Sequence, residues 1–189
     1  MQCTHTIAQP WCSAIARCSL CSTLQRSPTS THACITASHT MSEHVENAEE
    51  NDDADDAFQT PKYWDAFYDD EEVYDWYSAA GAMYAACRRE LRRLKGRGRV
   101  LDVGCGTASH LSALAKYADV TGVDFSETVI NANKAREEGV TYLVEDASSL
   151  SSLEDNSFDI VLDKGCLDCF VSAPDASFAR RDAFLRSVQ

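Results

Sequence analysis

Apolar positions in the second half of the chain follow two different periods. From Ser78 to Lys95 they recur every three or four residues, which predicts an amphipathic helix that ends at Gly96. Short apolar runs then alternate with further helical patterns. The runs predict strands at 99–103, 119–125, 140–146 and 157–165, and the helical patterns predict helices at 108–117, 126–138 and 175–188.

Strands that alternate with helices in this way predict right-handed βαβ units. The expected fold class is therefore α/β, a Rossmann-like parallel sheet with helices on both faces. We expect this domain to occupy residues 58–189. Residues 1–57 show neither period, and residues 43–56 contain eight acids and no base, so we expect a disordered N-terminal extension with an acidic stretch.

Charged residues stand at the end of every predicted strand in the domain. Asp102 ends the first strand and is followed by Gly104 and Gly106, and Asp124 ends the second strand. The third and fourth strands end in Glu145–Asp146 and Asp163–Lys164. Because ligands of parallel sheets bind at the carboxyl ends of the strands, we expect these side chains to line one binding edge.

Two classes of cofactor compete for this edge. A dinucleotide site needs a third glycine where this chain has Ser109, and Asp102 would repel the pyrophosphate. S-adenosylmethionine carries no phosphate. Its ammonium group suits Asp102, its ribose diol suits Asp124 and its adenine amino group suits Asp146. The two loop glycines also let the backbone approach a ligand closely, so the residues favour S-adenosylmethionine.

Several segments resemble a known family. VLDVGCGTASHL, GVDFS and EDASSL…DNSFDIVLDKG are similar to motifs of the class I, seven-strand S-adenosylmethionine-dependent methyltransferases. More narrowly, YWDAFY, DWY and FDIVLDKGCLDCF resemble the eukaryotic lysine methyltransferases that modify translation elongation factor 1-alpha, the methyltransferase-like protein 13 group. The resemblance covers about residues 60–175 and implies the following cofactor contacts: Trp64, Tyr68, Trp76, Gly104, Asp124, Phe125, Asp146, Ala147 and Lys164.

The resemblance also implies a reaction, the transfer of a methyl group to a protein lysine. We expect the protein to position and desolvate the reactants, and the aromatic lead-in to cover the cofactor as a lid. A sulfonium beside the lysine amine lowers the pKa of that amine, so no strong base is needed and no catalytic residue is assigned. Asp163 and Asp168 are candidates for steering a basic substrate, whereas His110 is expected to lie on a helix surface.

The length of the chain limits this interpretation. The seven-strand fold has three strands after the fourth, and the chain stops at Gln189 after one more helical pattern. We therefore expect a C-terminally incomplete sheet with about four of the seven strands, in which strand 157–165 is an exposed edge. An active methyltransferase seen only in part, a truncated non-catalytic cofactor-binding or interaction fragment, and a small-molecule methyltransferase all stay open at this point.

Composition bears on partners and location. The net charge of −13 argues against a nucleic-acid partner and suits a basic protein substrate. The sequence contains no apolar run of about 18 residues, so we expect no membrane span. The C-x-x-C pairs at 18–21 and 166–169 lie far apart and lack nearby histidines, so we expect no zinc site. Reduced-type cysteines such as Cys87 and Cys105 favour a cytoplasmic protein, and the acid-free residues 1–40 leave a mitochondrial transit segment as the alternative.

Overall fold

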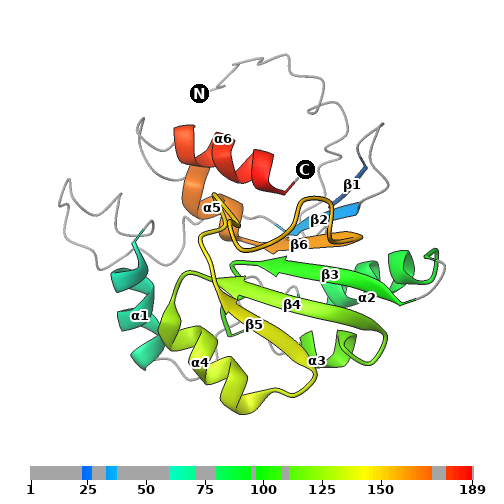
Figure 1. The fold of residues 1–189 in the computed structure, drawn as a ribbon, viewed down its shortest axis with the longest axis horizontal. Coiled ribbons are helices and arrows are strands. Elements are labelled where there is room, and N and C mark those ends of the chain that lie inside the picture. Colours follow the sequence, from blue (N-terminus) through cyan, green and yellow to red (C-terminus); the bar gives the residue numbers. More distant parts are fainter. Residues whose placement is uncertain are drawn as a thin grey trace, which may run out of the picture.

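A six-stranded sheet runs through the molecule, with helices on both of its faces (Figure 1). The computed structural model describes residues 23–26, 33–37, 60–70, 80–94, 97–107, 111–171 and 178–188. Its strands are β1 (Thr23–Arg26), β2 (Ala33–Ala37), β3 (Gly98–Val103), β4 (Ala118–Asp124), β5 (Val140–Val144) and β6 (Ile160–Lys164). Its helices are α1 (Pro61–Asp70), α2 (Ala80–Leu91), α3 (Leu111–Leu114), α4 (Glu127–Arg136), α5 (Cys166–Val171) and α6 (Phe178–Ser187).

The strand order is β1-β2-β6-β3-β4-β5, and neighbours from β2 to β5 are parallel. In the register, Val100 of β3 lies between Ile160 of β6 and Val120 of β4. The carboxyl ends of these strands therefore meet at one edge of the sheet. This arrangement confirms the predicted α/β, Rossmann-like fold with its four parallel strands from residue 98 onwards.

Strands β3, β4 and β6 are buried on both faces, and their successive side chains point into opposite clusters. One apolar cluster joins the sheet to α2, α3 and α4 through Met83, Cys87, Val100, Leu111, Leu114, Val120, Val129, Ile130, Ile160 and Leu162. The other joins it to α5 and α6 through Leu101, Val103, Val123, Val161, Phe170 and Phe184. The apolar runs of the sequence follow from this two-sided burial.

The helix predicted at 126–138 is confirmed as α4, with Ser126 as its N-cap, but it ends at Arg136. The side chain of Ser126 accepts a hydrogen bond from the backbone N–H of Val129, as an N-cap does. The helix predicted at 78–95 is confirmed as α2 but ends at Leu91. Directly after the helix the chain forms a tighter turn, in which the backbone N–H of Arg93 donates to the carbonyl of Glu90, three residues earlier, instead of four residues earlier as in an α-helix.

The expected exposed edge at strand 157–165 is wrong. In the structure β2 pairs with β6 in parallel, with Cys34 opposite Val161, and all five residues of β6 are buried. β1 then pairs with β2 in an antiparallel arrangement. Both strands fall inside the segment that we expected to be disordered, and their sequences, TLQR and ACITA, each contain only one leucine or isoleucine. The rest of residues 1–57 lies outside the described residues.

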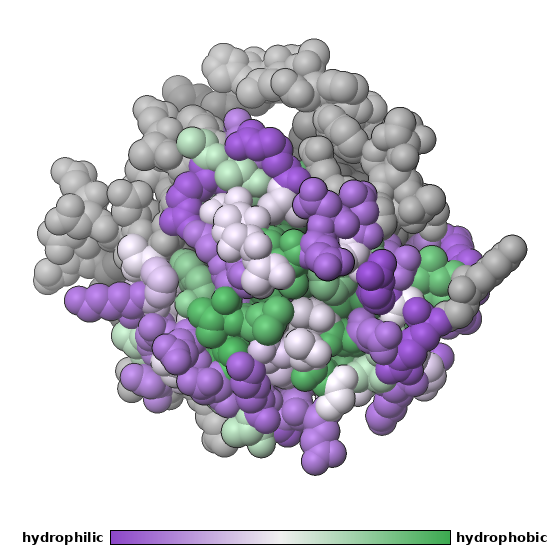
Figure 2. Space-filling view, in the orientation of Figure 1, coloured by the Kyte–Doolittle hydropathy of each residue, from purple (hydrophilic) through white to green (hydrophobic). Residues whose placement is uncertain are grey.

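The view of Figure 2 shows a mostly hydrophilic surface with apolar residues gathered over β4 and β5. β5 is an edge strand of the sheet in the part of the chain that the structure describes, and its Val144 is 49% exposed. Among the described helices, none is long and apolar enough to cross a membrane.

Candidate functional site

The loop after β3 fits between two helices because it has no side chains at two positions. Gly104 and Gly106 have φ angles of 61° and 51°, in the left-handed region that favours glycine. A Cβ atom added at Gly104 would lie 2.6 Å from the Cβ of Cys166 in α5. One added at Gly106 would lie 2.8 Å from the hydroxyl oxygen of Tyr68 in α1. The loop therefore brings bare backbone to the carboxyl edge of the sheet, as predicted.

Two polar side chains of α4 hold the carbonyl groups of this loop. The Asn133 side-chain amide donates to the carbonyl of Gly106 at 2.6 Å, and Arg136 donates to the carbonyl of Thr107 at 3.2 Å. Arg136 also donates to the side-chain oxygen of Asn133, which is fully buried. The sequence analysis missed both residues. A polar Asn at a core-facing position of a predicted helix was the available signal.

Asp124, predicted at the end of the second strand of the domain, lies beside the loop. One carboxylate oxygen accepts from the backbone N–H of Gly106 at 3.0 Å, and the other accepts from the backbone N–H of Ser126 at 2.9 Å. Its side chain is buried, and burial raises the pKa of Asp124 to about 6, while the backbone N–H groups lower it. Phe125 follows it and is half-buried.

Two further carboxylates are buried at the same edge, with one lysine. Burial raises the pKa of Asp102 to about 8, while the positive charge of Lys164 lowers it and the negative charge of Asp163 raises it. Burial likewise raises the pKa of Asp163 to about 7. Lys164 is buried as well. With a pKa of about 8, Asp102 is largely protonated near neutral pH, whereas Asp124, with a pKa of about 6, is largely ionised.

The predicted steering role of Asp163 and Asp168 does not fit their placement. Both are buried, with 2% and 7% exposure, so neither presents its charge at the surface. Instead, a carboxylate oxygen of Asp163 accepts from the backbone N–H of Leu167 at 3.2 Å and caps α5. A charge that follows a strand in the sequence says nothing about whether it faces water.

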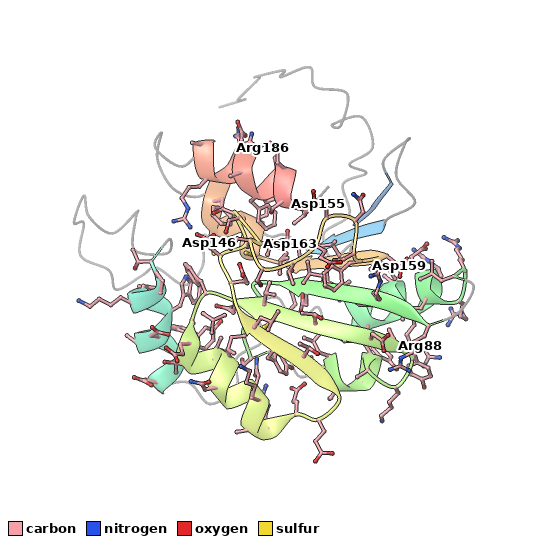
Figure 3. All side chains as sticks on the ribbon, in the orientation of Figure 1. Arg88, Asp146, Asp155, Asp159, Asp163 and Arg186 are labelled. Atoms are coloured by element: carbon pink, nitrogen blue, oxygen red, sulfur yellow. The ribbon has the colours of Figure 1, made fainter. Side chains whose placement is uncertain are left out.

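Asp146 and Ala147 lie in the turn after β5, against α6. One carboxylate oxygen of Asp146 accepts from the backbone N–H of Ser148 at 2.8 Å, and the other accepts from Arg180 at 2.7 Å. The carbonyl of Ala147 accepts from the hydroxyl of Ser187. Figure 3 shows Asp146 at the same end of the sheet as Asp163, whereas Arg88 and Asp159 lie at the opposite end. The ion pair with Arg180 joins residues 34 positions apart, so no local sequence pattern could predict it.

The aromatic segment expected to be a lid is α1, which packs on α4. Trp64 is 7% exposed and stacks on Tyr68 with ring centroids 5.8 Å apart. Tyr63 and Phe67 meet the Trp64 ring edge-on. Through Tyr68, this aromatic cluster reaches the loop at Gly106. Three residues named from the sequence, Trp76, Ser109 and His110, lie outside the described residues.

The cysteines near the site are free thiols, as expected of core residues. Burial raises the pKa of Cys87 and of Cys169 to about 12 and raises that of Cys105 and Cys166 as well. These thiols are therefore protonated and unreactive near neutral pH.

A family model described as "Methyltransferase domain" matches residues 101–187, the span that contains the loop and the buried acids Asp102, Asp124 and Asp163. This part of the chain is a methyltransferase domain. It covers β4 to β6 and the helices between and after them, and it begins within β3. The resemblance to methyltransferases on which the sequence analysis relied is thereby confirmed.

Curated proteins similar to this chain carry related names. The "eEF1A lysine and N-terminal methyltransferase" of Danio rerio is 32% identical over 132 residues, which are 66% of this chain and 19% of the relative. The "EEF1A lysine methyltransferase 4" of Bos taurus is 33% identical over 122 residues, which are 61% of this chain and 47% of the relative. The chain therefore spans less than half the length of these relatives.

Solved structures resemble the methyltransferase domain in fold. One comes from work on the conversion of a disulfide bond into a thioacetal group during echinomycin biosynthesis. It has a TM-score of 0.50 and 28% identity and covers 68% of this chain and 54% of its own. Another is the plantazolicin methyltransferase BpumL in complex with a substrate analogue and SAH, with a TM-score of 0.47, 21% identity and coverage of 70% and 50%.

The site of the methyltransferase domain suits S-adenosylmethionine in two respects. A side chain at Gly104 or Gly106 would clash with Cys166 or Tyr68. The loop therefore offers backbone groups to a ligand at these two positions. Asp124 is largely ionised near neutral pH, which suits a cofactor with a positive sulfonium and ammonium and no phosphate. A pyrophosphate would meet repulsion from Asp124 instead.

Proposed function

We propose that this protein transfers a methyl group from S-adenosylmethionine to lysine side chains of elongation factor 1-alpha. The observation that carries the cofactor is Asp124, held by two backbone N–H groups beside the glycine loop. The acceptor is supported by the names of the relatives, which share about a third of their aligned residues with this chain. Because the chain spans only part of those relatives, its activity as a whole protein belongs to the proposal.

The residues of the site divide the work of binding. When bound, S-adenosylmethionine supplies an electrophilic methyl group on a positively charged sulfur. Each carboxylate oxygen of Asp124 accepts one hydrogen bond from the backbone and has a second lone pair, which is what a ribose diol needs. Gly104 and Gly106 allow the left-handed turns that bring the backbone of the loop to the ligand. Asp124, with a pKa of about 6, is largely ionised near neutral pH and supplies negative charge.

Holding the partners together is the main task of such a site. The aromatic cluster on α1 packs over the loop and excludes water from it. A lysine amine that enters beside a positive sulfur meets a charge that lowers the pKa of the amine, so the amine loses its proton to solvent before it attacks. The net charge of −13 attracts a basic protein surface at long range.

The test is transfer of tritiated methyl groups to purified elongation factor 1-alpha by the 189-residue chain. We expect label in the acceptor that survives mild base, because methylamines are stable and methyl esters are not. Elongation factor whose amines have first been blocked by acetylation should take up no label, because an amide nitrogen is not a nucleophile. The matched control is Asp124→Ala, which should abolish transfer while an Asp69→Ala variant on the exposed side of α1 transfers normally.

Each result bears on a different part of the proposal. Base-labile label indicates a carboxylate acceptor and contradicts lysine methylation. Label in the amine-blocked protein does the same. No label, together with normal binding of S-adenosylmethionine, contradicts catalysis by this chain but leaves the cofactor site intact.

A further inference from the structure

Asp65 connects two parts of the molecule that are far apart in the sequence. It lies in α1, and one of its carboxylate oxygens accepts from the hydroxyl of Ser126 at 2.6 Å and from the backbone N–H of Thr128 at 3.3 Å. Both donors belong to the start of α4. A carboxylate is favoured at this place because the free N–H groups and the dipole of a helix make its N-terminus positive.

The contact continues from Ser126 into the cofactor site. The Ser126 hydroxyl donates a hydrogen bond to Asp65 and accepts one from the backbone N–H of Val129. These two bonds fix the hydroxyl, and the residue is fully buried. Its own backbone N–H donates to Asp124, whose other oxygen accepts from the backbone N–H of Gly106. A single chain of hydrogen bonds thus runs from α1 through Ser126 and Asp124 to the glycine loop.

The same helix carries the aromatic cluster. Tyr68 follows Asp65 by three residues and places its hydroxyl where a Cβ of Gly106 would lie 2.8 Å away. Trp64 precedes Asp65 and is buried against Tyr68. Figure 1 shows α1 beside the end of α4 that lies at the carboxyl edge of the sheet. The contact of Asp65 with the start of α4 therefore holds α1, and with it the aromatic side chains, against the loop.

We infer that Asp65 is a positioning residue for S-adenosylmethionine: by docking α1 on the N-terminus of α4, it holds Ser126, Asp124 and the glycine loop in the arrangement that binds the cofactor. Asp65 does not itself contact the cofactor in this account. It acts through Ser126. The inference rests on the proposed function, because it assigns Asp65 a part in binding that cofactor.

The test measures cofactor affinity by calorimetry on the full chain and its variants. Asp65→Ala removes both bonds to α4, and we expect it to weaken the affinity for S-adenosylmethionine about tenfold or more, because bonds to a charged group are lost. Asp65→Asn keeps an oxygen that accepts and should lie between the wild type and Asp65→Ala. Asp69→Asn makes the same charge change on an exposed position of the same helix and should bind like the wild type.

A double-mutant cycle separates positioning from general destabilisation. If Asp65 acts through Ser126, most of the effect of Asp65→Ala on affinity disappears in a Ser126→Ala background. A merely structural role would lower the unfolding midpoint of every variant but leave the affinity of the folded fraction unchanged. With elongation factor as substrate, Asp65→Asn should raise the KM for S-adenosylmethionine and leave kcat within about twofold, since KM reports the binding that is weakened.

The outcomes distinguish this inference from the proposed function. If the wild type does not bind S-adenosylmethionine, both fall together. If the wild type binds it and Asp65→Ala binds equally well, or Asp69→Asn is weakened as much as Asp65→Asn, the inference alone is overturned. Should Asp65→Ala fail to fold, the comparison of Asp65→Asn with Asp69→Asn decides, and equal affinities of these two overturn it.

Discussion

Replacing Gly104 by alanine tests how tightly the loop is enclosed. A non-glycine residue at a φ of 61° costs about 1–2 kcal/mol. The new Cβ would lie 2.6 Å from the Cβ and 2.7 Å from the Sγ of Cys166, and overpacking of this kind costs about 1–3 kcal/mol. The two effects together predict a loss of about 2–5 kcal/mol in the free energy of unfolding, a large part of the 5–15 kcal/mol, roughly, of a typical domain. Urea denaturation followed by circular dichroism measures it.

Gly106→Ala is the matched comparison, because its new Cβ would meet the end of a side chain, whereas that of Gly104→Ala would meet a Cβ close to the backbone. Its Cβ would meet the hydroxyl of Tyr68 at 2.8 Å, but the next atom of that ring lies 3.7 Å away, an ordinary contact. Tyr68→Phe should therefore recover most of the overpacking of Gly106→Ala, whereas Cys166→Ala keeps its Cβ and should not recover that of Gly104→Ala. A Gly104→Ala variant as stable as the wild type, or one rescued by Cys166→Ala, refutes this account of the loop.

Three further predictions concern the surroundings of the site. Because burial raises the pKa of Asp102 to about 8, the folded chain holds protons that the unfolded chain has lost, so its stability should fall as the pH rises from 5.5 to 8.5, roughly. Urea midpoints at the two pH values check this; Asp102→Asn should flatten the dependence, and a higher midpoint at the alkaline pH contradicts it. Asn133→Ala should cost about 1–3 kcal/mol, because it leaves the buried carbonyl of Gly106 without its 2.6 Å donor; chemical denaturation gives the value, and a neutral variant goes against the assigned role. Arg180→Ala removes a pair whose side chains are 35% and 41% exposed, so it should cost less than about 1 kcal/mol, and a loss as large as that of Asn133→Ala is the adverse result.

The elements that could be predicted from the sequence are those whose signal is local. β3, β4 and β6 have apolar runs because they are buried on both faces. β5, at the edge of the sheet, keeps the apolar pattern VTYLV although only its Tyr142 is buried. α4 has a capping serine directly before it. The acids at the strand ends then follow from the chain order alone, since parallel strands bring their carboxyl ends to one edge.

The elements that escaped prediction depend on contacts between distant segments. β2 has one strongly apolar residue, Ile35, in a segment rich in Ser, Thr and Cys, and its pairing with β6 defines it. α5 has six residues, fewer than two helical turns. Asp65 bonds to a residue 61 positions away and Arg180 to one 34 positions away, and no local sequence pattern predicts either hydrogen bond. Burial likewise cannot be read from a charge, which is why Asp163 and Asp168 were candidates for steering a basic substrate.

Calorimetry with S-adenosylmethionine measures cofactor binding without the need for a methyl acceptor. We expect the purified chain to bind this cofactor and its demethylated product, Asp124→Ala to weaken the binding of both by about a hundredfold or more, and NAD to give no heat. Tight binding of NAD, or binding of S-adenosylmethionine that is unchanged in Asp124→Ala, would contradict a cofactor site built around this carboxylate.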